Sequence, residues 1–295
     1  MEGRWTPMQR IKLEVFKEFF EKNLTGNEID FLIALTYVQD NRGIARGVFY
    51  RDMMAVTGMS TQAFYDCKRS LKEKGVISVQ RREQDYDITL IGNDFSGYTE
   101  EDYRLGNVKY IRTNMKLFRD ANWKKLKPAQ KLLVMDLVNI NTASSMRTYR
   151  IARKKFVEKY TELLQVTGRT LQKYMKFLKL YFYVGLKEGM YYITLRKQFC
   201  RSVAKTESDQ VNQHLLDTAC RRNRIKEPDE REAADILTVI SRYRKEIRDS
   251  FCDVVDVFRK MLEVLNANIP NRSKWKRRLK ASLYHKLLRE ELGLA

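Results

Sequence analysis

The feature that most constrains the fold is an internal repeat in the first two thirds of the chain. The segment Val56–Gly75 is typical of a turn, a capped helix and a glycine stop, and Val166–Gly185 repeats this pattern 110 positions later without a gap. Both copies begin with Val-Thr-Gly and end with glycine. Such a repeat predicts that one structural unit is formed twice, so the chain is expected to contain two related modules in tandem.

In the first copy, the sequence predicts a helix that starts after Ser60 and ends before Gly75. The Ser60 hydroxyl can accept a hydrogen bond from a first-turn amide, and Gly75 supplies the left-handed conformation at the stop. Phe64, Cys67 and Leu71 lie three and four residues apart, which predicts one buried face. The opposite face carries side chains that can reach phosphates and base edges. These candidate DNA contacts are Ser60, Thr61, Gln62, Tyr65, Lys68, Arg69 and Lys72.

The second copy predicts the same helix with a more basic outer face. Thr170 is the expected cap, Tyr174 and Phe177 continue the expected buried face, and Gly185 is the expected stop. The candidate DNA contacts of this copy are Arg169, Thr170, Gln172, Lys173, Lys176 and Lys179.

Each repeated helix is followed by alternating apolar residues that predict a β-hairpin, over 76–90 and over 184–195. The tip of the first hairpin contains Arg81 and Arg82, which are candidates for minor-groove or phosphate contact, although a solvated tip fits them equally well. An apolar helix and a short strand are expected upstream of each copy. For the first copy, the helix is expected over 29–38 and the strand over 44–46, and a capping-box spacing from Thr25 to Glu28 precedes the helix. For the second copy, the helix is expected over 132–140 and the strand over 151–153, and Pro128 precedes the helix.

Three further helices are predicted outside the repeats. Residues 7–23 are expected to extend the first module, and 114–125 to connect the modules through an apolar face that includes Trp123. After Pro228, apolar residues with a three-four rhythm predict a helix of about 35 residues. Its apolar seam is compatible with self-association as a coiled coil or with packing against a second stripe in the same chain, and we favour the latter. The second stripe is Trp275, Leu279, Leu283 and Leu287, so self-association or partner binding would use 229–292.

The expected fold is therefore mainly α with small β-hairpin wings: two tandem winged-helix domains and a C-terminal helical domain. The expected boundaries are 1–97 for the N-terminal helix and first winged helix, 98–112 for a linker, 113–204 for the second winged helix and 205–295 for the helical domain.

Charge points to a polyanionic partner, because 57 Lys and Arg stand against 37 Asp and Glu and give a net charge of +20. The excess is concentrated in residues 98–204, with 23 basic and 8 acidic residues, whereas residues 1–97 have 14 of each. The second module is therefore the expected main phosphate binder. Its most basic run supplies five further candidate contacts, Arg147, Arg150, Arg153, Lys154 and Lys155.

The sequence offers little for catalysis. The two histidines are isolated, and there is no Gly-rich phosphate loop, Gly-x-Ser-x-Gly motif or His-x-His pair. The four cysteines lack metal-ligand spacing, so we expect no metal, no cofactor and no enzymatic activity. No segment approaches the apolar length of a membrane span, which predicts a cytoplasmic protein associated with the nucleoid or a plasmid and without membrane contact.

The duplicated winged helix, with the motif VTGMSTQAFYDCKRSLKEKG and a helical tail, resembles the tandem winged-helix replication initiators of plasmids and mobile elements. It is also similar to replication-organiser and primosome-loading proteins of low-GC Gram-positive bacteria and their phages. The resemblance covers about residues 1–200, and it implies binding of double-stranded DNA at an origin and recruitment of replication proteins. A transcriptional regulator or a partition or transfer accessory protein remains the alternative, and a protein-interaction scaffold is the third possibility.

Overall fold

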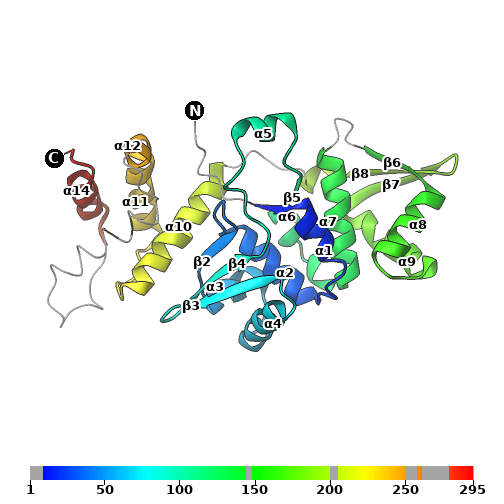
Figure 1. Cartoon of the computed structure of the whole chain (residues 1–295), viewed down its shortest axis with the longest axis horizontal. Coiled ribbons are helices and arrows are strands. Elements are labelled where there is room, and N and C mark those ends of the chain that lie inside the picture. Colours follow the sequence, from blue (N-terminus) through cyan, green and yellow to red (C-terminus); the bar gives the residue numbers. More distant parts are fainter. Residues whose placement is uncertain are drawn as a thin grey trace.

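The computed structural model describes residues 9–143, 148–199, 205–249, 258, 260 and 279–294 (Figure 1). It is a mostly helical protein in which the described residues also form three small antiparallel sheets. The two repeats have the same order of elements, namely a helix, a strand, two helices and a two-stranded hairpin. Their sheets have the same topology as well, because the first strand pairs with the last in the orders β2-β4-β3 and β6-β8-β7. The sequence repeat is therefore also a structural repeat.

The first repeat follows the sequence closely. Thr25 and Glu28 form the expected capping box at the start of the first helix. Gly58 (φ 72°) ends the next helix, and Ser60 caps the helix after it by accepting from the Ala63 amide. Phe64, Cys67 and Leu71 are buried, as their spacing predicted. The elements are α2 (Gly26–Thr36), β2 (Ile44–Val48), α3 (Tyr50–Thr57), α4 (Thr61–Glu73), β3 (Ile77–Arg81) and β4 (Tyr86–Leu90).

The second repeat is out of register with the gapless sequence match. The left-handed residue between its second and third helices is Gln165 (φ 52°) and not Gly168, which lies inside the helix. Thr167, rather than Thr170, is consequently the cap. The elements are α7 (Pro128–Ala143), β6 (Thr148–Ala152), α8 (Arg153–Leu163), α9 (Gly168–Tyr181), β7 (Phe182–Lys187) and β8 (Met190–Leu195).

This shift corrects two further expectations for the second repeat. Phe177 is 45% exposed, and the buried face of α9 consists of Leu171, Tyr174, Leu178 and Tyr181. Gly185 does not stop the helix, because α9 continues into β7 at Phe182 and Gly185 lies within that strand. Helix α9 matches α4 at a spacing of 107 residues instead of 110, a difference of nearly one helical turn. A shift of one turn keeps much of the apolar periodicity, which is why the sequence match looked continuous.

The segments around the repeats are shorter than expected. Residues 7 and 8 of the helix expected over 7–23 lie outside the described residues, and in place of the rest the chain forms β1 (Arg10–Lys12) and α1 (Leu13–Glu18), because β1 pairs with β5 (Tyr110–Arg112) across 100 residues of sequence. Residues 98–112, expected to be a linker, contain α5 (Glu100–Leu105) as well as β5. The helix expected over 114–125 is divided into α6 (Met115–Phe118) and the 3-10 helix η1 (Trp123–Lys125), and a second 3-10 helix, η2 (Lys197–Phe199), follows β8.

The two repeats pack together through α2 and α7, with a buried polar cluster at the seam. The Lys131 Nζ lies 2.7 Å from both carboxylate oxygens of Asp30, and the Trp123 Nε1 donates to Asp30 Oδ1 at 2.7 Å. Asp30 and Lys131 are 5% and 2% exposed. Burial raises the pKa of Asp30 and lowers that of Lys131, and the ion pair opposes both shifts. Trp123 is therefore a seam residue that joins the two modules.

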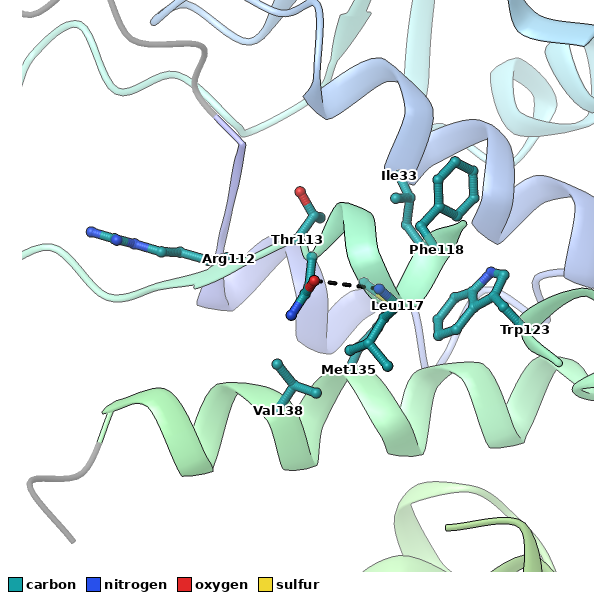
Figure 2. Close-up of a pocket in the computed structure, with 9 residues that line it drawn as sticks. Ile33, Arg112, Thr113, Leu117, Phe118, Trp123, Met135 and Val138 are labelled. Carbon is teal, nitrogen blue, oxygen red and sulfur yellow. Dashed lines mark hydrogen bonds between the residues drawn. The ribbon is translucent and has the colours of Figure 1, made fainter. Parts of the chain in front are cut away.

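A small cavity lies beside this cluster (Figure 2). Its volume is about 20 Å³, which is room for one water molecule. Ile33 of α2, Leu117 of α6 and Met135 of α7 line it together with Trp123. These residues belong to both modules, so the cavity is an imperfection of the seam and is too small for an organic cofactor.

The C-terminal residues form α10 (Lys205–Arg222), α11 (Glu230–Arg242), α12 (Arg244–Asp249) and α14 (Ala281–Glu291). The single helix expected after Pro228 is interrupted at Tyr243, where the Tyr243 hydroxyl and the His285 Nε2 lie 2.7 Å apart. Helix α11 packs against α14, as the preferred intrachain arrangement predicted. The buried residues of α14 are Tyr284 and Leu288, one position beyond the expected Leu283 and Leu287, and Trp275 lies outside the described residues.

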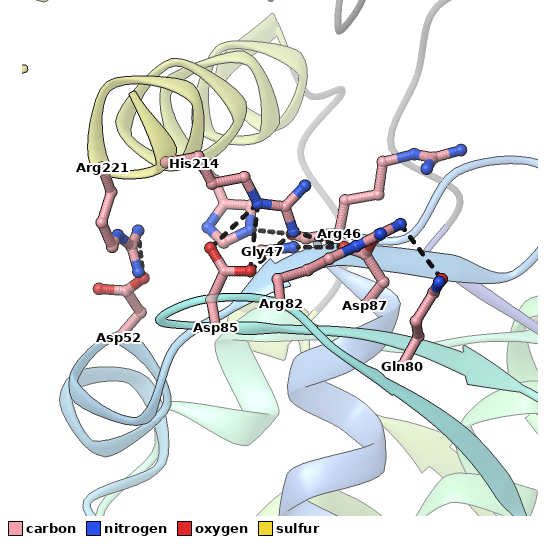
Figure 3. Close-up of polar contacts among 10 residues, drawn as sticks. Arg46, Gly47, Asp52, Gln80, Arg82, Asp85, Asp87, His214 and Arg221 are labelled. Carbon is pink, nitrogen blue, oxygen red and sulfur yellow. Dashed lines mark hydrogen bonds and ion pairs between the residues drawn. The ribbon is translucent and has the colours of Figure 1, made fainter. Parts of the chain in front are cut away.

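Helix α10 docks on the sheet of the first repeat (Figures 1 and 3). Gly47 of β2 has φ +66°, and a Cβ at this position would lie 2.0 Å from Thr218 of α10, so only glycine allows so close an approach. The His214 Nε2 lies 2.8 Å from the Arg46 carbonyl oxygen, and burial lowers the pKa of this histidine. Among the described C-terminal residues, α10 thus makes the main attachment to the first repeat.

The same helix carries a titratable group with an expected effect on stability. Burial raises the pKa of Asp217 to about 6, so the folded state disfavours its ionised form. The resulting loss of folding stability is absent below the ordinary carboxyl pKa of about 4 and grows as pH rises toward 6. Replacing Asp217 with Asn should therefore stabilise the protein by about 1–2 kcal/mol at pH 7.5 and by much less at pH 4. Urea unfolding of both proteins at the two pH values measures this, and an equal difference at both values would contradict it.

Candidate nucleic-acid interface

Helix α9 presents a basic surface. Arg169, Lys173, Lys176 and Lys179 are exposed, whereas Leu171, Tyr174 and Leu178 hold the opposite face in the core. The sequence of α9 contains no acidic residue. Among the described residues, none of these four cations forms an ion pair with a carboxylate. A row of unneutralised cations on one rigid helix is the arrangement expected for phosphate contacts.

Helix α4 has a different electrostatic character. Asp66 accepts hydrogen bonds from Gln62 at 3.0 Å and from Arg69 at 2.7 Å, so this carboxylate engages two of the predicted contacts. The Lys68 Nζ lies 3.3 Å from the centroid of the Tyr86 ring and 4.8 Å from that of Tyr65, which makes it half-buried between aromatic side chains. The remaining predicted contacts on this helix are exposed: Ser60, Thr61, Tyr65 and Lys72.

The register of the two helices changes which residues correspond. At the structural spacing of 107, Arg169 occupies the position of Gln62, and Gln172 that of Tyr65. Lys176 and Lys179 occupy the positions of Arg69 and Lys72. The two glutamines that match in the sequence therefore lie at different positions of their helices, and the two surfaces would not make the same contacts.

The basic run before α9 is distributed over two elements. Arg150 lies on β6, exposed, with its Cζ 5.6 Å from the centroid of the Tyr192 ring. Arg153, Lys154 and Lys155 form the first turn of α8, which has no side-chain cap. Cations are unfavourable at this position, because the N-terminus is the positive end of the helix dipole. An anion bound there would be stabilised by the cationic side chains and by the helix dipole. Arg147 lies outside the described residues.

The tip of the first hairpin is held by neighbouring groups. Arg81 and Arg82 are both exposed, but the Arg82 Nε donates to Asp87 Oδ2 at 2.8 Å and its Nη2 donates to Gln80 Oε1 at 3.1 Å. On the other side, Arg222 of α10 contacts Asp85 and Asp87, the two carboxylates labelled in Figure 3. Hydrogen bonds from Arg222 and Arg82 lower the pKa of Asp87 despite the opposing effect of burial. Arg82 is therefore less available to a ligand than Arg81.

The second hairpin supplies residues that the sequence analysis did not select. Its tip is Glu188-Gly189, with both residues at positive φ, and Lys187 is exposed beside it. Arg196 follows β8, with its Cζ 4.8 Å from the centroid of the Tyr183 ring, and Tyr183 is 58% exposed. Along β7, Phe182 is buried and Tyr183 and Lys187 are exposed, and only their position directly before and within the predicted hairpin could have pointed to them.

The described residues provide no group of three or more His, Cys, Asp or Glu side chains suited to a metal ion. Burial raises the pKa of Cys67 and of Cys220 to about 12, which keeps both thiols protonated. In the part of the chain that the structure describes, no helix has the length and apolar character needed to cross a membrane. The charged surfaces of α4, α8 and α9 are the candidate ligand-binding surfaces of the two repeats.

Comparison of the chain with protein-family models, with curated proteins and with solved structures finds no match.

Proposed function

We propose that this protein binds double-stranded DNA through two winged-helix readers, with α4 and α9 as the helices that enter the major groove. The main support for the proposal is the α9 surface, where four exposed cations form no ion pair with a carboxylate of the described residues. The order of elements in each repeat and the pairing of the first strand with the last support the winged-helix assignment. The positive first turn of α8 supports a phosphate contact beside α9.

The two readers are expected to contribute unequally. The α9 surface supplies phosphate affinity, because its cations are free of acidic neighbours on their own helix. On the α4 surface, Asp66 pairs with Arg69 and accepts from Gln62, and the helix also supplies polar and aromatic groups, so its contribution lies in base contacts and positioning. Two readers on one chain would cover adjacent stretches of duplex, which is the reason we place the protein with replication initiators of plasmids or mobile elements.

Changing Lys173, Lys176 and Lys179 together to Gln is expected to weaken duplex binding and to flatten its salt dependence. Each lost phosphate contact should remove about 0.9 from the slope of log K against log salt concentration, so the triple variant should lose about 2.7. Fluorescence anisotropy with a labelled duplex at several salt concentrations measures both quantities.

The matched control changes Lys17, Lys226 and Lys286 to Gln, which removes the same charge from three exposed lysines on other elements. The control should keep the parent slope within about 0.5. If both triple variants bind with the same affinity and slope, the α9 surface is not the phosphate-binding face.

Gln172→Ala is expected to change sequence preference with little effect on the salt slope, because Gln can pair with an adenine edge. Gln172 is exposed, whereas Gln62 is hydrogen-bonded to Asp66, so Gln62→Ala should have the smaller effect. Discrimination at one base pair should fall by about 5- to 100-fold for Gln172→Ala, as measured by selection from a random duplex pool. Identical selected sequences for the parent and the Gln172 variant would exclude Gln172 from base contact.

The same selection tests the biological role. Several copies of the selected site near the gene would support an initiator, and a single copy would support a transcriptional regulator or an accessory protein for partition or transfer. A parent protein that selects no sequence and shows no salt-dependent duplex binding would contradict the proposed function.

A further inference from the structure

The ribbon formed by β1 and β5 has one apolar and one cationic face. Its register places Ile11 opposite Ile111, and both are buried in the core. Because successive side chains of a strand alternate, the residues on either side of them share the opposite face. These residues are Arg10, Lys12, Tyr110 and Arg112. Arg10 and Arg112 are direct cross-strand partners, a like-charge pairing that disfavours a ribbon.

The ribbon is rigidly attached to the first repeat. The Lys12 amide donates to Asn93 Oδ1 at 2.8 Å, and Asn93 Nδ2 donates to the Arg10 carbonyl oxygen at 3.1 Å. The Gln39 Nε2 donates to the same carbonyl at 2.8 Å. Asn93 and Gln39 are buried, so the positions of the cationic side chains are set by a fixed backbone.

Four aromatic rings surround these cations in a closed circuit. Neighbouring ring centroids are 6.1–6.4 Å apart. The rings are those of Phe95, Tyr98, Tyr103 and Tyr110. The Arg10 Cζ lies 4.7 Å from the centroid of Tyr110 and 5.0 Å from that of Tyr103, and the Lys12 Nζ lies 4.9 Å from that of Tyr98. Phe95 is buried, and Tyr98 is 39% exposed.

Arg112 Nη2 donates to the Tyr110 hydroxyl at 3.0 Å and Arg10 hydrogen-bonds with Tyr103, which leaves the other guanidinium N–H groups for an anion. An arginine stacked on aromatic rings keeps N–H groups in the plane of the guanidinium, where they can bind phosphate oxygens. Among the described residues, none of the cations Arg10, Lys12 and Arg112 forms an ion pair within 4.0 Å. Asp94 is the carboxylate whose charge acts on Lys12, and hydrogen bonds from Ser96 are the main cause of its lowered pKa.

We propose that the cationic face of the β1–β5 ribbon, together with Tyr98 and Tyr103, binds a single-stranded polynucleotide. Arg10, Lys12 and Arg112 would contact consecutive phosphates, and the exposed Tyr98 ring, beside the half-buried Tyr103, would stack on a base. A rigid combination of cations and aromatic rings suits a single strand, whose bases are free to stack on side chains, better than a duplex, whose bases are already stacked.

This site is separate from the proposed duplex-binding surface. In Figure 1, α5, which carries Tyr103, lies at the top of the molecule, whereas α4 lies at the bottom. The two surfaces use different residues, so the single-strand proposal does not depend on the duplex proposal. A protein with both surfaces could hold a duplex and an unpaired strand at the same time.

The experiment compares binding of labelled dT20 and rU20 by anisotropy over a range of salt concentrations. The parent should bind dT20. In the variant with Arg10, Lys12 and Arg112 changed to Gln, the slope of log K against log salt concentration should fall by about 2, because each phosphate contact with a single strand contributes about 0.7 to this slope. Tyr98→Leu should weaken binding at least about fivefold, whereas Tyr98→Phe should restore it, because only an aromatic ring stacks on a base. The rU20 arm shows whether the strand is RNA, DNA or either.

Two controls separate a binding role from a purely structural one. Each variant should keep the parent's circular dichroism spectrum and duplex affinity, which a misfolded ribbon would change. The variant with Lys173, Lys176 and Lys179 changed to Gln should keep its dT20 affinity. The proposal is overturned if the parent binds neither oligonucleotide, if the ribbon variants bind with the parent's affinity and slope, or if the α9 variant loses dT20 binding to the same extent as the ribbon variants.

Discussion

Replacing Asp30 with Ala should lower the free energy of unfolding by about 3–5 kcal/mol, because Lys131 would be left as a buried cation without its carboxylate, with only the Gly26 carbonyl oxygen as acceptor. Lys131 is 2% exposed, and its ammonium contacts both oxygens of Asp30. The Trp123 indole would lose its acceptor as well. The effect should be large because an uncompensated charge at the seam cannot reach water without separating the two repeats.

Urea unfolding followed by tryptophan fluorescence and circular dichroism measures this loss. The informative control replaces both members of the pair, Asp30 with Leu and Lys131 with Met. An apolar pair of similar volume should recover most of the stability, since removal of both charges also removes the cost of burying them. A single Asp30→Ala variant that unfolds within about 1 kcal/mol of the parent would show that the seam opens readily or that water reaches Lys131.

Arg222→Ala should release α10 from the first hairpin, because the free energy that favours docking of this helix should fall by about 3–5 kcal/mol. The Arg222 guanidinium contacts Asp85 at 2.7 Å and Asp87 at 2.6 Å, and these carboxylates are 1% and 5% exposed. Without Arg222, Asp85 would remain buried with its principal ion-pair partner removed. Hydrogen exchange of the β3–β4 hairpin and of α10 should increase, while exchange of α9 should be unchanged.

The control for this prediction is Arg224→Ala, which removes an ion pair with Glu83 between two largely exposed side chains. Such a surface pair is worth about 0–1 kcal/mol, so exchange should be close to that of the parent. The effect of Arg222→Ala should also depend on pH. The pKa of Asp87 is lowered in the folded state, so the stabilisation by Arg222 is present above the ordinary carboxyl pKa and is lost as pH falls through the lowered value. A difference between parent and variant that grows on acidification would contradict this assignment.

The repeat shows how far sequence periodicity leads and where it fails. The amphipathic character of both helices, the hairpins and the order of elements followed from local patterns. The register of α9 did not, because a shift of nearly one helical turn leaves the apolar stripe almost in phase. The position of the left-handed residue decides the register, and the chain uses Gln165 there although Gly168 fits the sequence pattern better. Gln172 therefore remains a candidate contact, but it is not the counterpart of Gln62.

The candidate surfaces were predictable to different degrees. The exposed cations of α9 follow from composition and a helical period, since Lys173, Lys176 and Lys179 recur three residues apart opposite an apolar face. The engagement of Gln62 and Arg69 by Asp66 on α4 depends on side-chain rotamers, which the sequence pattern does not fix. The cationic ribbon was not predictable, because Arg10 and Arg112 lie a hundred residues apart and meet through strand pairing.

The sequence by itself determined the duplicated module, the concentration of positive charge in the second copy and the capping of individual helices, because these features depend on neighbours within a few residues. Only the tertiary structure decided how the modules join, which buried carboxylates are paired and where α10 docks. Asp30, Asp85 and Gly47 look ordinary in the sequence, and their roles depend on Lys131, Arg222 and Thr218, which lie far along the chain. Long-range pairing of this kind is set by the packing of complete elements, which no local period encodes.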